Sequence, residues 1–217
     1  MISGLVSLVR SPTSYFRARR DDPPRALPVG VLAATGLSTL LAQLLLVSMS
    51  VIGDGPTITY VTAPVRLELP QITVTGALIS FGHVYVYWIV YAGVFYLLTK
   101  PFAEDESAGF SPVFWLTGIG FSPWVLSGLV WLGAMVVSAE MTPPPETTAG
   151  NDAFVEQVQE TSLVVASNYL DNLMTVWSLF LWTRLLKAVR GVTDLQSVFA
   201  VLPVAAFEAF KTVVLFS

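Results

Sequence analysis

Four ionisable side chains fall within stretches of sequence that are otherwise apolar: His83, Asp171, Glu208 and Lys211. Burying a charged group in a membrane is costly, so such residues often belong to an ion or proton site. Counted at about 1.5 Å per helical residue, His83 and Glu208 reach a similar depth in their helices. A first hypothesis is that these two side chains meet and form a proton- or ion-responsive pair.

An alternative interpretation gives the same residues structural roles. Lys211 follows Glu208 by three residues, so the two share one helix face and can form an ion pair. The lysine then extends outward to the lipid headgroups. His83 would hydrogen-bond a serine or a backbone carbonyl, and Asp171 would lie in the headgroup layer. The sequence leaves both interpretations open.

Few other residues could carry chemistry. The chain has one histidine and no cysteine, and it contains no HExxH, Walker, dinucleotide-binding or GxSxG pattern. A serine hydrolase would have His83 as its only histidine base, with no clear nucleophile beside it. We therefore expect no enzymatic activity, no cofactor and no metal site. The formal net charge of −4 also argues against nucleic acid as a partner.

The elements that hold these residues are expected to be membrane-spanning helices. Hydrophobic residues make up 54% of the chain and charged residues only 12%, about half the charged share of a soluble domain. Five apolar stretches approach or exceed the roughly 20 residues that a bilayer requires: about 27–52, 72–99, 112–138, 166–186 and 196–216. We expect an all-α fold, a polytopic bundle of five transmembrane helices over 27–217 preceded by a basic cytoplasmic segment at 1–26.

Some features interrupt the helical pattern. Pro123 and Pro203 fall inside predicted spans, where each would remove a backbone hydrogen bond and bend the helix. Residues 57–74 alternate in places and can form an extended segment. Residues 154–165 predict either a short amphipathic helix at the membrane surface or the first turns of the fourth span.

The basic residues are distributed unevenly. With five crossings, nine of the 11 lysines and arginines lie on one side of the membrane, against Arg66 and Lys211 on the other. The positive-inside rule then predicts a multi-pass protein of the plasma membrane with its N-terminus in the cytoplasm and its C-terminus outside. The predicted outer loop at 139–165 agrees, because it carries five acidic residues and no lysine or arginine.

The first 26 residues combine apolar and basic positions. Apolar residues from Ile2 to Val9 lie close to one helical face and arginines follow, a pattern typical of an interfacial amphipathic helix. The candidates for binding anionic lipid or protein partners are the basic residues of the cytoplasmic face: Arg17, Arg19, Arg20, Arg25, Arg184, Lys187 and Arg190. The alternative is that these residues only fix the orientation of the chain.

Three pieces of the sequence carry a family resemblance: SPTSYFRARRDDPPRALPVGVLAA near the start, GFSPWVLSGL at 120–129, and VWSLFLWTRLLKAVRGVTDLQSVFAVLPV at 176–204. Together they resemble prokaryotic members of the Yip (Ypt/Rab-interacting protein) domain family. The resemblance implies five spans and a cytoplasmic N-terminus. Eukaryotic relatives bind small GTPases in vesicle traffic, a role that does not carry over directly to a prokaryotic chain. The acidic loops suit an archaeal, halophilic source.

Two functions follow as hypotheses. The first is a non-enzymatic membrane scaffold or adaptor that recruits partners or shapes the membrane through its basic face. The second is a small oligomeric transporter or channel that uses His83, Asp171 and Glu208. A homo-oligomer is compatible with both.

Overall fold

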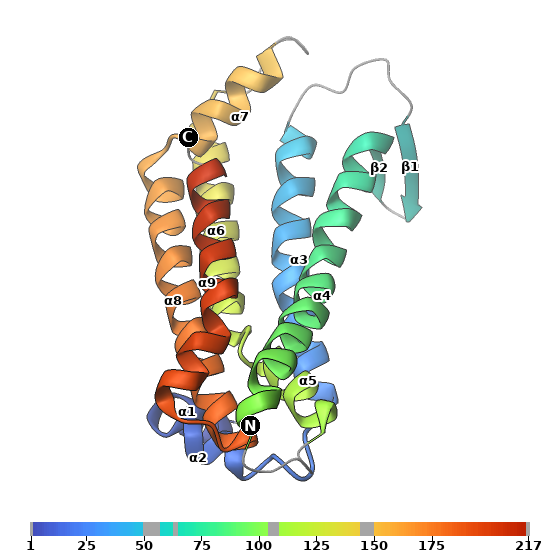
Figure 1. Cartoon of the computed structure of the whole chain (residues 1–217). Helices are drawn as coiled ribbons and strands as arrows, with labels where there is room; N and C mark the ends of the chain where they lie inside the picture. The colour runs from blue at the N-terminus through green and yellow to red at the C-terminus, as the bar shows by residue number, and fades with distance from the viewer. Residues whose placement is uncertain (1, 50–56, 63–64, 104–108, 144–149, 216–217) are drawn as a thin grey trace. The chain divides into compact units, whose positions relative to one another are not determined.

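The computed structural model describes residues 2–49, 57–62, 65–103, 109–143 and 150–215, and in these ranges the chain is helical apart from one hairpin (Figure 1). The elements are α1 (Ile2–Arg10), α2 (Pro12–Arg17), α3 (Ala26–Met49), β1 (Thr57–Thr62), β2 (Val65–Pro70), α4 (Gln71–Thr99), a 3₁₀ turn η1 (Lys100–Phe102), α5 (Phe110–Ile119), α6 (Ser122–Met141), α7 (Asn151–Gln159), α8 (Ser162–Arg190) and α9 (Asp194–Leu215). The helical class is as predicted. β1 and β2 pair antiparallel, where the sequence alternates.

Helices occupy all five stretches predicted as spans as far as these are described; residues 50–52 and 216 lie outside the described residues. Among the described residues, three stretches are long and apolar enough to cross a membrane: Leu78–Phe102, Phe110–Met141 and Asp194–Val213. The apolar stretch Ala26–Leu41 in α3 is shorter. α8 is long enough, but polar and charged residues such as Asp171 and Arg184 lower its hydropathy. Five crossings therefore stay a prediction.

The predicted third span is not one continuous helix. α5 ends at Ile119 and α6 begins at Ser122, with a turn at Gly120 and Phe121 between them. Pro123 is the second residue of α6, where a missing N–H costs no helical hydrogen bond. The prediction that Pro123 bends a helix from inside was wrong, whereas Pro203 does lie inside α9.

Residues 154–165 divide between the two interpretations of this segment. α7 is a separate short helix that ends at Gln159, and α8 begins at Ser162. Phe154 and Val158 of α7 pack against a cluster that includes Met135 of α6 and Val164 of α8. Residues 154–159 therefore lie in a separate short helix whose apolar residues pack against neighbouring helices, and residues 162–165 are the first residues of α8. The place of α7 at the membrane surface stays a prediction.

Contacts divide the chain into two compact units. Unit 1 consists of Met1–Leu32, Tyr85–Trp124 and Met174–Ser217, and unit 2 consists of Ala33–Val84 and Val125–Leu173. Helices α3, α4, α6 and α8 contribute residues to both units. The predicted division into 1–26 and 27–217 follows topology rather than contacts, and it stays a prediction.

Unit 1 is apolar both inside and outside. Its core includes Phe95, Phe121 and Trp182, which are fully buried. Large apolar side chains also cover its surface, since Leu195 is 80% exposed and Phe210 64% exposed. Leaving such a side chain in water forfeits about 1.5–3 kcal/mol relative to burial. This exposed apolar surface is what a helix needs when lipid surrounds it.

Candidate functional site

Glu208 of α9 is a buried carboxylate, only 6% exposed. Tyr91 of α4 donates a hydrogen bond from its hydroxyl to Glu208 Oε1. The Lys211 ammonium lies 2.8 Å from the other carboxylate oxygen, Oε2. A buried charge is tolerated when it is both paired and hydrogen-bonded, and Glu208 meets both conditions. The predicted Glu208–Lys211 ion pair is thus present.

The ammonium of Lys211 also lies among aromatic rings from three helices. Its Nζ is 4.6 Å from the ring centroid of Tyr87, 5.7 Å from that of Trp124 and 5.5 Å from that of Phe207. A cation within about 6 Å of an aromatic face is attracted by the negative potential of the ring. We call Glu208, Tyr91 and these three rings the Lys211 cage.

Tyr91 is held in place by neighbouring rings. It stacks on Tyr87 at 5.7 Å and on Phe121 at 6.0 Å, and it meets Trp182 edge to face at 5.5 Å. These contacts restrict the phenol and direct its hydroxyl toward Glu208. Sequence reasoning missed Tyr91 as the partner of Glu208. The available signal was the four-residue spacing of Tyr87 and Tyr91, which puts both on one helix face.

Two tryptophans hold the break between α5 and α6, which brings Trp124 into the cage. Trp182 Nε1 donates to the Thr117 carbonyl at 3.0 Å, and Trp88 Nε1 donates to the Phe114 carbonyl at 2.6 Å. The Thr117 carbonyl lies in the last turn of α5, where helical partners run out, and it accepts from Gly120 N as well. Phe114 lies further back in α5. A Cβ at Gly120 would overlap the Trp182 indole. Glycine is therefore required there for this close approach.

The other two intramembrane candidates belong to the second compact unit. His83 and Asp171 lie in unit 2, whereas Glu208 lies in unit 1. Asp171 is exposed and accepts a hydrogen bond from the buried Ser127 hydroxyl at 2.7 Å. The structure thus provides the Glu208–Lys211 pair of the alternative interpretation, and the meeting of His83 with Glu208 stays a prediction.

The N-terminal part of the predicted basic face is partly exposed. Arg17 and Arg25 are exposed. The Arg19 guanidinium lies 3.7 Å from the centroid of the Tyr15 ring and donates to the Tyr15 carbonyl at 3.1 Å. Burial raises the pKa of Tyr15, although the Arg19 charge acts in the opposite direction. Arg19 is thus engaged with Tyr15 of α2. Arg25 is exposed, but its guanidinium lies 6.0 Å from the ring centroid of Trp115.

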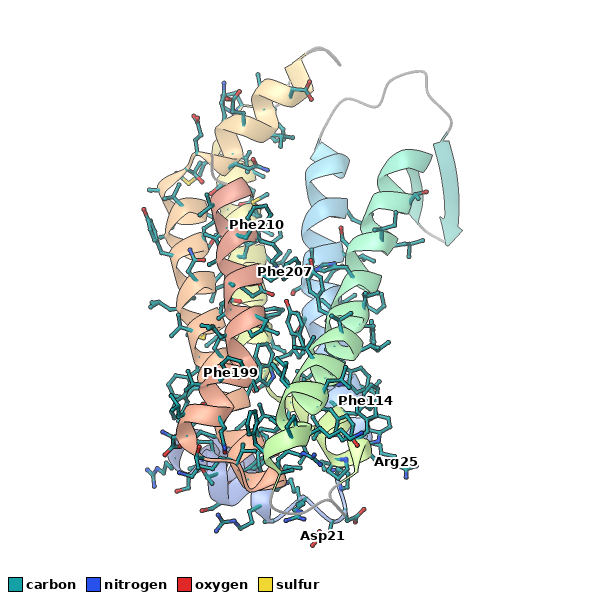
Figure 2. The ribbon with its side chains drawn as sticks, viewed as in Figure 1. Asp21, Arg25, Phe114, Phe199, Phe207 and Phe210 are labelled. Carbon is teal, nitrogen blue, oxygen red and sulfur yellow. The ribbon has the colours of Figure 1, made fainter. Side chains whose placement is uncertain are left out.

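Arg20 is the fourth arginine of this segment, and its Nε lies 4.0 Å from the Asp21 carboxylate. A pair at this distance with an exposed partner contributes little to stability. Figure 2 shows Asp21 and Arg25 at the end of unit 1 where α1 and α2 lie. The turn between α8 and α9 lies at the same end of this unit (Figure 1).

The last turns of α8, just before that turn, carry the remaining basic residues. Arg184 Nη1 lies 3.3 Å from Asp194 Oδ1, and Lys187 Nζ lies 2.8 Å from Asp194 Oδ2. The Asp194 side chain is 66% exposed. Two cations therefore converge on one accessible anion. Arg190 is different, because it is 2% exposed and its guanidinium packs 4.9 Å from the Tyr96 ring centroid.

Local sequence explains the shape of this turn. Gly191 adopts a positive φ of 69°, a conformation that favours glycine and commonly ends a helix. Thr193 and Gln196 then bond reciprocally, with Thr193 N donating to Gln196 Oε1 at 2.9 Å and Gln196 N donating to Thr193 Oγ1 at 3.3 Å. This capping box begins α9 and leaves Asp194 facing Lys187.

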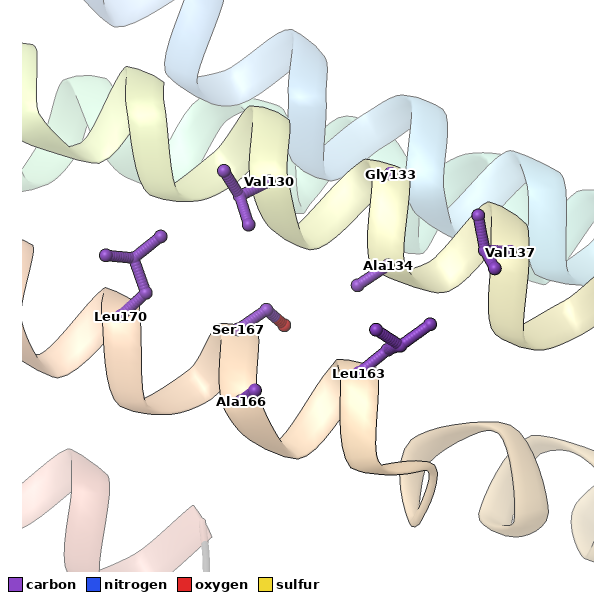
Figure 3. Close-up of a pocket in the computed structure, with 8 residues that line it drawn as sticks. All are labelled: Val130, Gly133, Ala134, Val137, Leu163, Ala166, Ser167 and Leu170. Atoms are coloured by element: carbon purple, nitrogen blue, oxygen red, sulfur yellow. The ribbon is translucent and has the colours of Figure 1, made fainter.

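A cavity of about 360 Å³ lies between α6 and α8 within unit 2 (Figure 3). Its lining residues are Val130, Gly133, Ala134 and Val137 of α6 with Leu163, Ala166, Ser167 and Leu170 of α8. The Ser167 hydroxyl donates to the Val164 carbonyl at 2.7 Å. The lining has no charged group, so this cavity offers contact to an apolar chain and no acid–base chemistry.

Within the described ranges, no group of three or more histidine, aspartate or glutamate side chains could hold a metal ion. The profile of the Yip1 domain matches residues 6–214, nearly the whole chain. No curated protein and no solved structure matches this chain.

Proposed function

Since this chain belongs to the Yip1 domain family, we propose that it is a non-enzymatic membrane scaffold or adaptor. Its basic face binds anionic lipid headgroups and thereby recruits protein partners or shapes the membrane. The family and the apolar helices both indicate a membrane protein. The proposed scaffold or adaptor role rests on the arrangement of the basic residues.

The proposed topology has five crossings of the plasma membrane. α3, α4, the α5–α6 pair, α8 and α9 each cross once, so the two ends of the chain lie on opposite sides. The N-terminus lies in the cytoplasm and the C-terminus outside. The charge bias of the sequence supports this orientation. The resemblance to prokaryotic Yip proteins supports a prokaryotic source, in which the vesicle-traffic role of the eukaryotic relatives does not apply.

One observation carries the proposal: Arg184 and Lys187 hold the two oxygens of a single exposed carboxylate, that of Asp194. This geometry would also accept two oxygens of a phosphate group. Arg17 and Arg25 are exposed at the same end of unit 1. A basic residue near an anionic membrane surface contributes about 1 kcal/mol of attraction, so these four residues can supply substantial binding together.

The test uses the full chain in nanodiscs that mix phosphatidylcholine with phosphatidylglycerol. Energy transfer from tryptophan to a labelled phosphatidylglycerol reports how strongly the anionic lipid gathers around the protein. We expect the enrichment to fall in Arg17→Gln/Arg25→Gln and in Arg184→Gln/Lys187→Gln. Lys100→Gln removes an exposed cation outside the proposed set and serves as the matched control. Enrichment that is unchanged in both double variants, or reduced equally by Lys100→Gln, would defeat the proposal.

The buried Glu208 favours one second candidate, a small oligomeric transporter or channel that uses Glu208 with His83 and Asp171. A carboxylate inside a membrane helix is often part of an ion path. Flux of protons or monovalent cations in proteoliposomes tests this function. Flux that disappears in Glu208→Gln would support it, and the absence of flux from the unaltered protein would exclude it.

A further inference from the structure

We propose that the Lys211 cage is an ammonium-binding site and that Lys211 is its built-in ligand. A choline-type lipid headgroup or a small quaternary ammonium ion can take the place of the lysine. The site is formed by the carboxylate of Glu208, the hydroxyl of Tyr91 and the rings of Tyr87, Trp124 and Phe207.

The chemistry of the cage selects a cation. Aromatic faces and a carboxylate both attract positive charge, and together they are the usual means by which proteins recognise quaternary ammonium groups. The three ring centroids lie 4.6 to 5.7 Å from the lysine nitrogen. An anion would meet the Glu208 carboxylate and the negative faces of the rings. The site therefore takes ammonium ligands and excludes phosphate or carboxylate.

The position of Lys211 gives such a ligand access. The lysine side chain is 28% exposed, while the carboxylate beneath it is 7% exposed. Phe207 is itself exposed, so one wall of the cage faces outward. Lys211 lies four residues before the end of α9 at Leu215, which is about 6 Å along the helix axis. If α9 crosses the membrane, the ammonium reaches the level of the lipid headgroups.

A covalent labelling experiment on the unaltered full chain tests the proposal. The rate at which a water-soluble reagent acetylates Lys211 is measured in nanodiscs, with the exposed Lys100 as an internal reference. One arm adds tetramethylammonium chloride to phosphatidylglycerol nanodiscs, against sodium chloride of equal concentration. The other arm compares phosphatidylcholine nanodiscs with phosphatidylglycerol nanodiscs. Neither quaternary ammonium group reacts with the reagent.

Displacement of the lysine should raise the acetylation of Lys211 relative to Lys100 by about fivefold, the change that one cation–ring contact supplies. An increase only with tetramethylammonium identifies a soluble cation as the ligand, and an increase only in phosphatidylcholine identifies the headgroup. Acetylation of Lys211 that follows Lys100 in both arms would overturn the proposal.

Two variants of exposed rings on α9 test the cage itself. Phe207→Leu removes a wall of the cage, while Phe210→Leu removes a ring of the same size one turn further along (Figure 2). We expect faster acetylation of Lys211 without added ammonium in Phe207→Leu, and an unchanged rate in Phe210→Leu. Equal rates in the two variants would show that the rings do not hold the cation.

Discussion

Among the described residues of unit 1, two lysine–carboxylate pairs have the same N···O distance in different surroundings. Lys211 lies 2.8 Å from Glu208, and Lys187 lies 2.8 Å from Asp194. The Glu208 side chain is 7% exposed, whereas that of Asp194 is 66% exposed. Distance alone would rank the two pairs equally. Burial is what separates their consequences.

In the buried pair, each partner keeps the other from being an isolated charge in an apolar medium. Removing one partner of such a pair typically costs more than the pair contributes. In the exposed pair, water and salt ions already compete for both partners, so the pair contributes little to stability. The buried pair therefore constrains the fold, while the exposed pair is free to exchange its carboxylate for another anion.

The largest effect is expected from Lys211→Met, which keeps the length of the side chain and removes its charge. Glu208 is then left as a buried carboxylate without its cation, and the free energy of unfolding should fall by about 3–5 kcal/mol. Lys187→Met is the matched change in the exposed pair and should cost about 0–1 kcal/mol. Thermal or denaturant unfolding of the full chain in detergent measures both.

A double variant sharpens this contrast. Glu208→Gln/Lys211→Met removes both charges and leaves a neutral amide that can still accept the Tyr91 hydrogen bond. It should be more stable than Lys211→Met alone, because no uncompensated charge remains. A double variant as unstable as the single one would mean that packing rather than charge accounts for the loss.

An intermediate loss of stability is expected from a change at Gly120, in the break between α5 and α6 that brings Trp124 to the Glu208–Lys211 pair. Gly120→Ala places a methyl group against the Trp182 indole, and such overpacking typically costs about 1–3 kcal/mol. Gly93→Ala is the control, because no atom lies within 4 Å of a Cβ built at that helical glycine, and alanine favours a helix. If the two variants unfold at the same temperature, the close Gly120–Trp182 contact does not hold the break between α5 and α6.

The sequence predicted the helices and the Glu208–Lys211 pair for simple reasons. Long apolar runs specify helices in lipid, and a three-residue spacing puts two side chains on one face. It could not identify Tyr91 as the partner of Glu208, because the two residues are 117 positions apart and only packing brings them together. The break at Gly120 was missed for a similar reason, since Trp182, which occupies the space above that glycine, comes from another helix.

The burial of Arg190 also lay beyond the sequence. A basic residue at the end of an apolar helix is normally exposed, and the pattern placed Arg190 with Arg184 and Lys187. In the structure its guanidinium packs against Tyr96 of α4, and no local pattern connects these two residues. Its assignment to a lipid-binding face stays a prediction, now with less of its charge accessible than that of its neighbours.

The smallest effect on stability is expected from Asp194→Asn, and here function gives the sharper measurement. Losing two exposed ion pairs should change the free energy of unfolding very little, because water and salt already screen them. Arg184 and Lys187 are then free for lipid phosphate, so enrichment of phosphatidylglycerol around the protein should rise by a few-fold at low salt. Asp22→Asn removes the same charge from an exposed position outside this pair, and it controls for the general change in charge. The difference between the two variants should shrink as salt rises, since the Debye length falls from about 30 Å at 0.01 M to about 10 Å at 0.1 M. Equal enrichment in the two variants would mean that Asp194 does not compete with lipid phosphate for Arg184 and Lys187. The exposed Lys187–Asp194 pair would then differ from the buried Lys211–Glu208 pair only in being weaker.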